Sequence, residues 1–203
     1  MLKTFRESLC AGILITIGGT VFLSCENKTA GAVLFSVALL CICYKGYYLF
    51  TGKIGYIVEQ HKKQDYLNLA VGFFGNLIAT FLLGMLLRTV LPNIGERAAE
   101  MCSAKLAQFP LYSFIRGFFC GILMYLAVSI YKEKNSVLGV LFCVPVFILC
   151  GFEHSIADMF YFGTSGIFDT KIIFFMALIV AGNTLGAMVL PLLKGVHTNE
   201  KQG

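Results

Sequence analysis

Charged residues are scarce in this sequence of 203 residues, at 13% against 58% hydrophobic residues, and the mean hydropathy is +0.80. A soluble domain of this length buries only about 70% of its unfolded surface, so it would leave large apolar patches in water. The composition therefore excludes a soluble enzyme and predicts a protein whose solvent is the lipid bilayer.

Signals for cofactor binding and for processing are also missing. The eight cysteines form no CxxC pair, so we predict neither a disulfide framework nor a bound metal or other cofactor. The first apolar stretch follows Lys3 and Arg6 as in a signal peptide, but it lacks a clear small-residue cleavage site. We therefore expect that stretch to remain as a helix of the mature protein.

Six uncharged stretches are candidate membrane spans. They are residues 8–24, 29–44, 66–87, 117–131, 135–152 and 172–193. A transmembrane helix needs about 20 residues, and the second and fourth stretches are short. They reach this length if the second continues through Lys45 to Leu49 and the fourth begins near Leu106. The sequence thus predicts an all-α membrane protein of six transmembrane helices, with a further helical stretch at residues 96–100.

The distribution of basic residues predicts the orientation. With six spans, both termini lie on one side, together with nine of the sixteen lysines and arginines. These are Lys3, Arg6, Lys53, Lys62, Lys63, Lys132, Lys134, Lys194 and Lys201. By the positive-inside rule this side is the cytoplasm, so we expect a multi-pass protein of the inner (cytoplasmic) membrane with cytoplasmic termini. The net charge of +5 is then a topology signal, and no nucleic-acid partner is predicted.

Two features occur once in each half of the chain. One is a Gly-Asn pair followed by a small side chain, and the other is an interruption of the half's middle span. The pairs lie at residues 75–76 and 182–183, and the interruptions at residues 49–52 and 151–155. Three spans per half imply an inverted repeat, of about residues 1–90 and 106–195, within one channel domain of residues 1–203. Such repeats place a permeation site near the middle of the membrane.

Glu153 and His154 are the strongest candidates for function. They interrupt a long apolar run that resumes after them without a loop composition. Ionisable side chains at membrane depth cost several kcal/mol unless they face protein or water, so such residues are functional candidates by default. Two alternative interpretations stay open. In the first, the helix ends at Gly151 and Glu153 and His154 lie at an ordinary membrane–water interface. In the second, the protein is a membrane enzyme in which His154 and Asp158 share a helix face as metal ligands.

The residues around this break resemble a known family. The sequence Gly-Phe-Glu-His-Ser-Ile-Ala-Asp-Met-Phe at residues 151–160 is similar to the fifth-helix signature of the formate/nitrite transporter family. Leu-Phe-Thr-Gly at residues 49–52 resembles its second-helix loop, and residues 119–128 resemble its fourth helix. The two Gly-Asn pairs resemble its third and sixth helices, so the resemblance spans almost the whole chain.

The resemblance implies a channel and not an enzyme. It implies an aquaporin-like fold with broken second and fifth helices, a homopentamer in the bilayer, and small monovalent anions such as formate, nitrite or hydrosulfide as substrates. The pore and substrate-binding residues that it implies are His154, Thr51, Lys105, Asn183, Leu49, Phe50, Phe152 and Glu153.

The chain departs from the family pattern at four positions. Asp158 and Gly121 stand where the family has asparagine, Lys53 stands where asparagine is common, and Tyr48 replaces an acidic residue. We expect the fold and the class of function to survive these changes, whereas selectivity and gating do not carry over.

The energetics favour a neutral histidine in the pore. A bare anion in an apolar constriction faces a Born cost of tens of kcal/mol, whereas protonating an acid of pKa about 4 at pH 7 costs roughly 4 kcal/mol. We therefore expect passage as the neutral acid or with a shared proton, past a neutral His154 that Thr51 orients. Lys105 is expected at the outer mouth, where its charge concentrates anions. A neutral-solute channel is the alternative, and the absence of an Asn-Pro-Ala motif weakens it.

Overall fold

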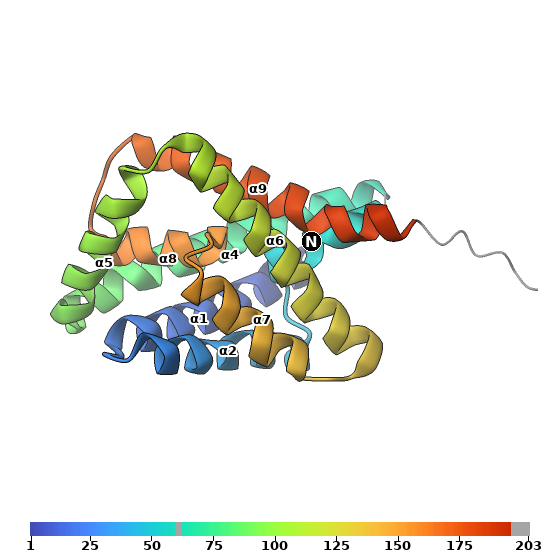
Figure 1. Cartoon of the computed structure of the whole chain (residues 1–203), viewed down its shortest axis with the longest axis horizontal. Coiled ribbons are helices and arrows are strands. Elements are labelled where there is room, and N and C mark those ends of the chain that lie inside the picture. The colour runs from blue at the N-terminus through green and yellow to red at the C-terminus, as the bar shows by residue number, and fades with distance from the viewer. Residues whose placement is uncertain (60–61, 196–203) are drawn as a thin grey trace, which may run out of the picture.

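The computed structural model describes residues 1–59 and 62–195, and every regular element in these ranges is a helix (Figure 1). The long helices are α1 (Leu2–Ser24), α2 (Lys28–Lys45), α4 (Lys63–Val90), α6 (Pro110–Lys134) and α9 (Lys171–Lys194). The shorter ones are α3 (Phe50–Lys53), the 3₁₀ helix η1 (Ile54–Val58), α5 (Pro92–Leu106), α7 (Leu138–Leu149) and α8 (Ser155–Ser165). Of the basic residues that predict the orientation, Lys201 lies outside the described residues.

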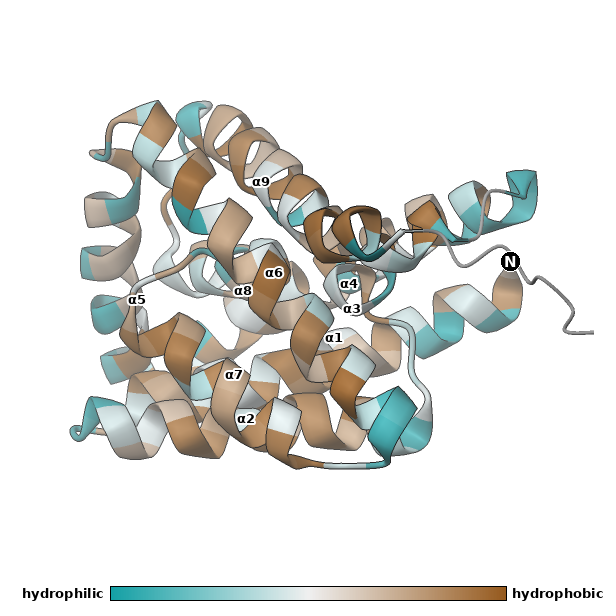
Figure 2. Ribbon diagram, turned by 45° about the vertical axis from the view of Figure 1, so that its right-hand side comes forward, coloured by the Kyte–Doolittle hydropathy of each residue, from teal (hydrophilic) through white to brown (hydrophobic). Residues whose placement is uncertain are grey.

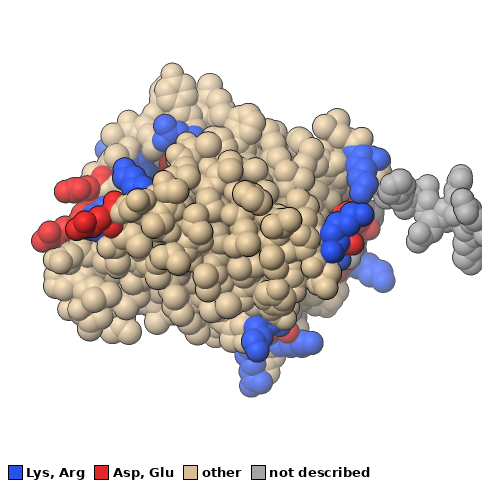
Figure 3. Space-filling model, turned by 60° about the horizontal axis from the view of Figure 1, so that its bottom comes forward, with Lys and Arg blue, Asp and Glu red and all other residues tan. Residues whose placement is uncertain are grey.

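The surface of the helical bundle is that of a protein in a bilayer. The five long helices are each long and apolar enough to cross a membrane, and α7 is a shorter apolar helix. Large apolar side chains face outward, among them Phe142 and Ile173 at 67% and 75% exposure. Charged side chains gather toward the edges of the view in Figure 3 and leave a broad uncharged surface between them, and the outer helices are predominantly apolar in Figure 2. These features match the membrane environment expected from the composition.

The helices pack closely in two groups. Helix α1 lies against α2 and α4, while α6 lies against α9 and α7, and α8 fits between α4 and α5. Glycine allows the closest approach, because a Cβ atom at Gly186 would lie 1.9 Å from the carbonyl oxygen of Phe118. In Figures 1 and 2 the start of α1 and the end of α9 lie toward one end of the molecule, with α5 at the other.

Two predicted helix boundaries are wrong. Helix α2 does not continue to Leu49 but ends at Lys45, because Gly46 adopts a left-handed conformation (φ 67°) and its N–H donates to the Cys43 carbonyl. Helix α6 begins at Pro110 and not near Leu106, where α5 ends. Proline is well suited to the first turn of a helix, since it has no N–H to leave unpaired there.

The predicted fifth span, residues 135–152, is also revised. Helix α7 ends at Leu149, and Gly151 turns the chain with a left-handed conformation (φ 68°). Four residues after Gly151 the chain is helical again, in α8, which begins at Ser155. The helix predicted around residues 96–100 is confirmed as part of α5.

Candidate functional site

Asn76 of α4 holds the connection between α2 and α3. Its side-chain oxygen accepts the N–H of Phe50 at 2.8 Å. Its amide nitrogen donates to the carbonyl oxygens of Tyr48 at 2.9 Å and Ser8 at 2.8 Å. Asn76 is fully buried, so these bonds satisfy backbone groups that water cannot reach.

Asn183 of α9 holds the connection between α7 and α8 by the same set of bonds. Its oxygen accepts the N–H of Ser155 at 2.9 Å, and its nitrogen donates to the carbonyl oxygens of Glu153 and Gly117, both at 2.8 Å. It is also fully buried, and it lines none of the described cavities discussed below. The predicted substrate-binding Asn183 therefore lies where it positions the connection that carries His154.

His154 is held at the start of α8 with both ring nitrogens occupied. Its Nδ1 accepts the backbone N–H of Ala157 at 3.1 Å, and its Nε2 lies 2.8 Å from the Thr51 hydroxyl. The ring of Phe147 stacks on the imidazole, with the centroids 5.7 Å apart. A nitrogen that accepts an N–H carries no proton, so this geometry favours a neutral imidazole with its proton on Nε2, pointing to Thr51.

A cavity of about 250 Å³ lies beside His154, and it is called the larger cavity because a second one, near α3, has only about 70 Å³. The wall of the larger cavity combines apolar and charged side chains, including Phe152, Tyr161, Glu153, Lys105 and Asp158. Phe152 stacks on Phe119 with ring centroids 5.5 Å apart. The cavity wall therefore combines aromatic side chains near His154 with the charged side chains of Lys105, Glu153 and Asp158 and, separately, Arg116.

A smaller cavity of about 70 Å³ lies near the other end of α6. It is lined by Leu49 and Gly52 beside α3, and by Val128 and Lys132 of α6. The larger cavity is lined by Arg116, sixteen residues earlier on the same helix, which is about 24 Å along a helix axis. Leu49 and His154 thus border two separate cavities on the two sides of the Thr51 contact.

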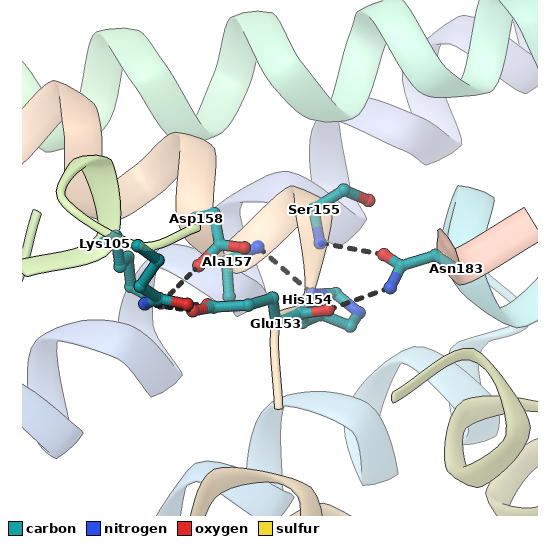
Figure 4. A network of polar contacts seen from close by, with 8 residues as sticks. Lys105, Glu153, His154, Ser155, Ala157, Asp158 and Asn183 are labelled. Carbon is teal, nitrogen blue, oxygen red and sulfur yellow. Dashed lines mark hydrogen bonds and ion pairs between the residues drawn. The ribbon is translucent and has the colours of Figure 1, made fainter. Parts of the chain in front are cut away.

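Lys105 forms ion pairs with two carboxylates (Figure 4). Its ammonium contacts Glu153 Oε2 and lies 3.0 Å from Asp158 Oδ1, and only 12% of its side chain is exposed. Burial lowers the pKa of Lys105, but the Asp158 and Glu153 carboxylates raise it by more, so the net pKa lies above the usual lysine value. The role of Lys105 in concentrating anions at the mouth stays a prediction, and both carboxylates offset its charge.

The remaining predicted residues separate into two groups. Thr51, Phe152 and Glu153 lie around His154, and Leu49 borders the smaller cavity. Phe50 instead packs against Phe73, with ring centroids 5.0 Å apart, and lines neither of these cavities.

The structure does not bring His154 and Asp158 together as metal ligands. Asp158 binds Lys105, and both ring nitrogens of His154 are engaged. Among residues 1–59 and 62–195, no three histidine, cysteine, aspartate or glutamate side chains are grouped in a way that could hold a metal ion.

Three residues of the site were not among the predicted pore and substrate-binding residues. Asn76 was detectable from its Gly-Asn pair, and Asp158 from its place in the fifth-helix signature. Phe147 was detectable as the end of the Pro-Val-Phe sequence at residues 145–147, which resembles the family's approach to the fifth-helix break, but its stacking on His154 was not predicted.

Comparison with known proteins identifies similar sequences. A profile of the family described as formate/nitrite transporter matches residues 1–194. An uncharacterized transporter of Bacillus subtilis (strain 168), YwcJ, is 30% identical over 185 residues, covering 81% of this chain and 72% of that protein. The formate channel FocA of Escherichia coli (strain K12) is 25% identical over 187 residues, covering 78% of this chain and 65% of that protein.

Solved structures share the fold. A pentameric formate channel with formate bound superimposes with a TM-score of 0.82 at 24% identity, covering 95% of each chain. An ion channel of the FNT family gives a TM-score of 0.79 at 21% identity, covering 95% of this chain and 87% of that one. The arrangement of helices described above is therefore that of these channels.

Proposed function

The chain belongs to the formate/nitrite transporter family, and from this premise we propose that it is a membrane channel or transporter for small monovalent anions of weak acids. Formate, nitrite and hydrosulfide are the substrate class. The protein is a multi-pass membrane protein, since five of its helices are long and apolar enough to span a bilayer.

The observation that carries this proposal is the Thr51–His154 contact between two cavities. The larger cavity admits an anion as far as the imidazole, where Nε2–H and the Thr51 hydroxyl are donors beside the aromatic ring of Phe147. Leu49 borders the far side. An anion that accepts these hydrogen bonds, or takes up a proton, crosses at far lower cost than a bare ion.

The two asparagines support an inverted repeat of six membrane segments, with α2–α3 and α7–α8 as the broken ones. Asn76 binds the first N–H of α3, at Phe50, and Asn183 binds the first N–H of α8, at Ser155. In this correspondence Leu49 is the equivalent of His154. Only one half of the repeat thus supplies an ionisable group to the centre.

The experiment for this function is a flux measurement in proteoliposomes with formate, nitrite, hydrosulfide and glycerol. We expect saturable or diffusive anion flux above that of protein-free vesicles, and no glycerol flux. Flux of glycerol without flux of any anion would favour the neutral-solute channel instead.

Assembly is a further expectation. We propose a homopentamer, because the solved formate channel with a TM-score of 0.82 is pentameric and apolar side chains cover the outer helices. Native mass spectrometry or light scattering in mild detergent should give five protomers. A monomer in several different detergents would contradict this expectation.

Orientation is the third expectation. Cytoplasmic termini place α5 on the outer side of the inner membrane. A cysteine introduced at the exposed Asn93 should therefore react with an impermeant maleimide added to intact cells, above the background of the unaltered protein. A cysteine at the exposed Lys62 should react only after the membrane is opened. The reverse labelling pattern would overturn the orientation.

A further inference from the structure

The ion pairs of Lys105 contain an excess of negative charge. One ammonium faces two carboxylates, those of Glu153 and Asp158, and each carboxylate side chain is only 2% exposed. If all three groups were ionised, the cluster would carry a net charge of −1 in the wall of the larger cavity. This is unfavourable beside a path for anions, because a buried charge interacts strongly at short range.

The hydrogen bonding of Asp158 is also incomplete in the ionised state. Its Oδ1 binds Lys105, but its buried Oδ2 has no hydrogen-bond partner in the described part of the chain. Glu153 and Asp158 both contact the same Lys105 ammonium, so their carboxyl groups are held close to each other. Two like charges held this close in a buried site disfavour full ionisation, so the pair favours one bound proton.

The other titratable groups near Asp158 do not replace this proton. They are Cys102 of α5, Cys120 of α6 and Tyr161 of α8, all of which are neutral at neutral pH in their usual ionisation range. His154 is engaged through both nitrogens with Thr51 and Ala157. Arg116 of α6 also lines this cavity, but it forms no ion pair with either carboxylate among the described residues. Lys105 is therefore the positive charge that the pair contacts, and it balances one carboxylate.

We propose that Lys105, Glu153 and Asp158 form a binding site for one exchangeable proton in the wall of the larger cavity, and that this proton sets the charge met by an entering anion. With the proton bound, the cluster is neutral and anions enter. When the proton leaves to water through the cavity, the cluster becomes −1 and repels them. This inference rests on the proposed anion transport for its effect on flux, but the proton site itself is independent of transport.

The first test is the pH dependence of anion flux with Asp158→Asn, which leaves Lys105 and Glu153 as a balanced pair. We compare the ratio of variant flux to wild-type flux at each pH, because protonation of the weak-acid substrate changes both fluxes equally and cancels in this ratio. We expect this ratio to rise by about tenfold between pH 6 and pH 8, as estimated for a unit charge roughly 10 Å from the ion at an effective dielectric constant of about 20. A ratio that does not change with pH would overturn the effect on flux.

Glu100→Gln is the matched control. It removes one negative charge from α5, the helix that carries Lys105, but at an exposed position without an ion pair to Lys105. Exposed charges are screened within about 10 Å at 0.1 M salt, so its flux ratio should stay within about twofold across the pH range. A tenfold rise for Glu100→Gln as well would assign the effect to general surface charge and overturn the role of Asp158.

The second test detects the bound proton directly, by infrared spectroscopy. Infrared spectra of the wild-type protein should show the carbonyl stretch of a protonated carboxylic acid at pH 6, declining toward pH 8. This signal should be missing in Asp158→Asn and retained in Glu100→Gln. A wild-type protein with no such signal would overturn the proton site. A protein with the signal but no anion flux would keep the proton site and overturn the proposed transport.

Discussion

Replacing His154 with phenylalanine should reduce formate and nitrite flux by about 100-fold while the protein keeps its helical fold. The side chain is 3% exposed and stacks on Phe147, so a ring of similar size fits the same space. The change removes Nε2–H, the donor shared with Thr51. A lost hydrogen bond to a charged group costs about 1.5–3 kcal/mol, which corresponds to roughly 10- to 150-fold in rate.

His154→Asn is the matched variant. Asparagine is a favoured N-cap residue, so its oxygen can still accept the N–H of Ala157, and its amide keeps a donor for Thr51. It keeps a hydrogen-bond donor at this position, so we expect partial flux, above that of His154→Phe and below that of the wild type. Circular dichroism and gel filtration verify folding, and flux is measured in proteoliposomes. Wild-type flux and pH dependence in well-folded His154→Phe protein would end the proposed mechanism.

Asn183→Ala should give the largest loss of stability. The substitution leaves the buried N–H of Ser155 without an acceptor, and it leaves the carbonyl oxygens of Glu153 and Gly117 without their side-chain donor. Each unsatisfied buried group costs about 1–3 kcal/mol, so we expect destabilisation of at least about 3 kcal/mol. Because the same bonds hold the connection before α8, flux should fall together with the thermal unfolding midpoint in detergent.

Two control variants test whether the loss of stability comes from the hydrogen bonds of Asn183. Asn183→Asp keeps the acceptor for the Ser155 N–H but places an oxygen against two carbonyl oxygens, so it should be no more stable than the alanine variant. Asn93→Ala, at an exposed position of α5, should leave the unfolding midpoint within the range of ordinary surface substitutions, about 0.5 kcal/mol. Equal midpoints for Asn183→Ala and Asn93→Ala would show that Asn183 does not hold the connection.

Much of the fold could be predicted from hydropathy alone. Apolar stretches of about 20 residues demand a helix in a bilayer, since every backbone group must be bonded within its own segment. The five long helices match five of the six predicted stretches in order. Helix ends were less accurate, because Gly46 and Pro110 act through backbone geometry that an apolar run does not reveal.

The sequence predicted only part of the candidate site. Glu153 and His154 were conspicuous because charge is costly at membrane depth, and the two Gly-Asn pairs marked buried positions on α4 and α9. The sequence did not decide the role of Asn183, because an amide in a membrane helix can equally face a substrate or the backbone of a broken helix. Its three bonds to main-chain atoms favour the second role.

The sequence by itself determined the solvent, the helical class and the residues able to carry chemistry, because these depend on composition and on spacing along one segment. Only the tertiary structure decided which of them meet. Thr51 reaches His154 across 103 residues, and Lys105 pairs with Asp158 across 53 residues of chain. Such contacts follow from how whole helices pack, and local periodicity does not encode them. The charge at the larger cavity is therefore a property of the folded protein.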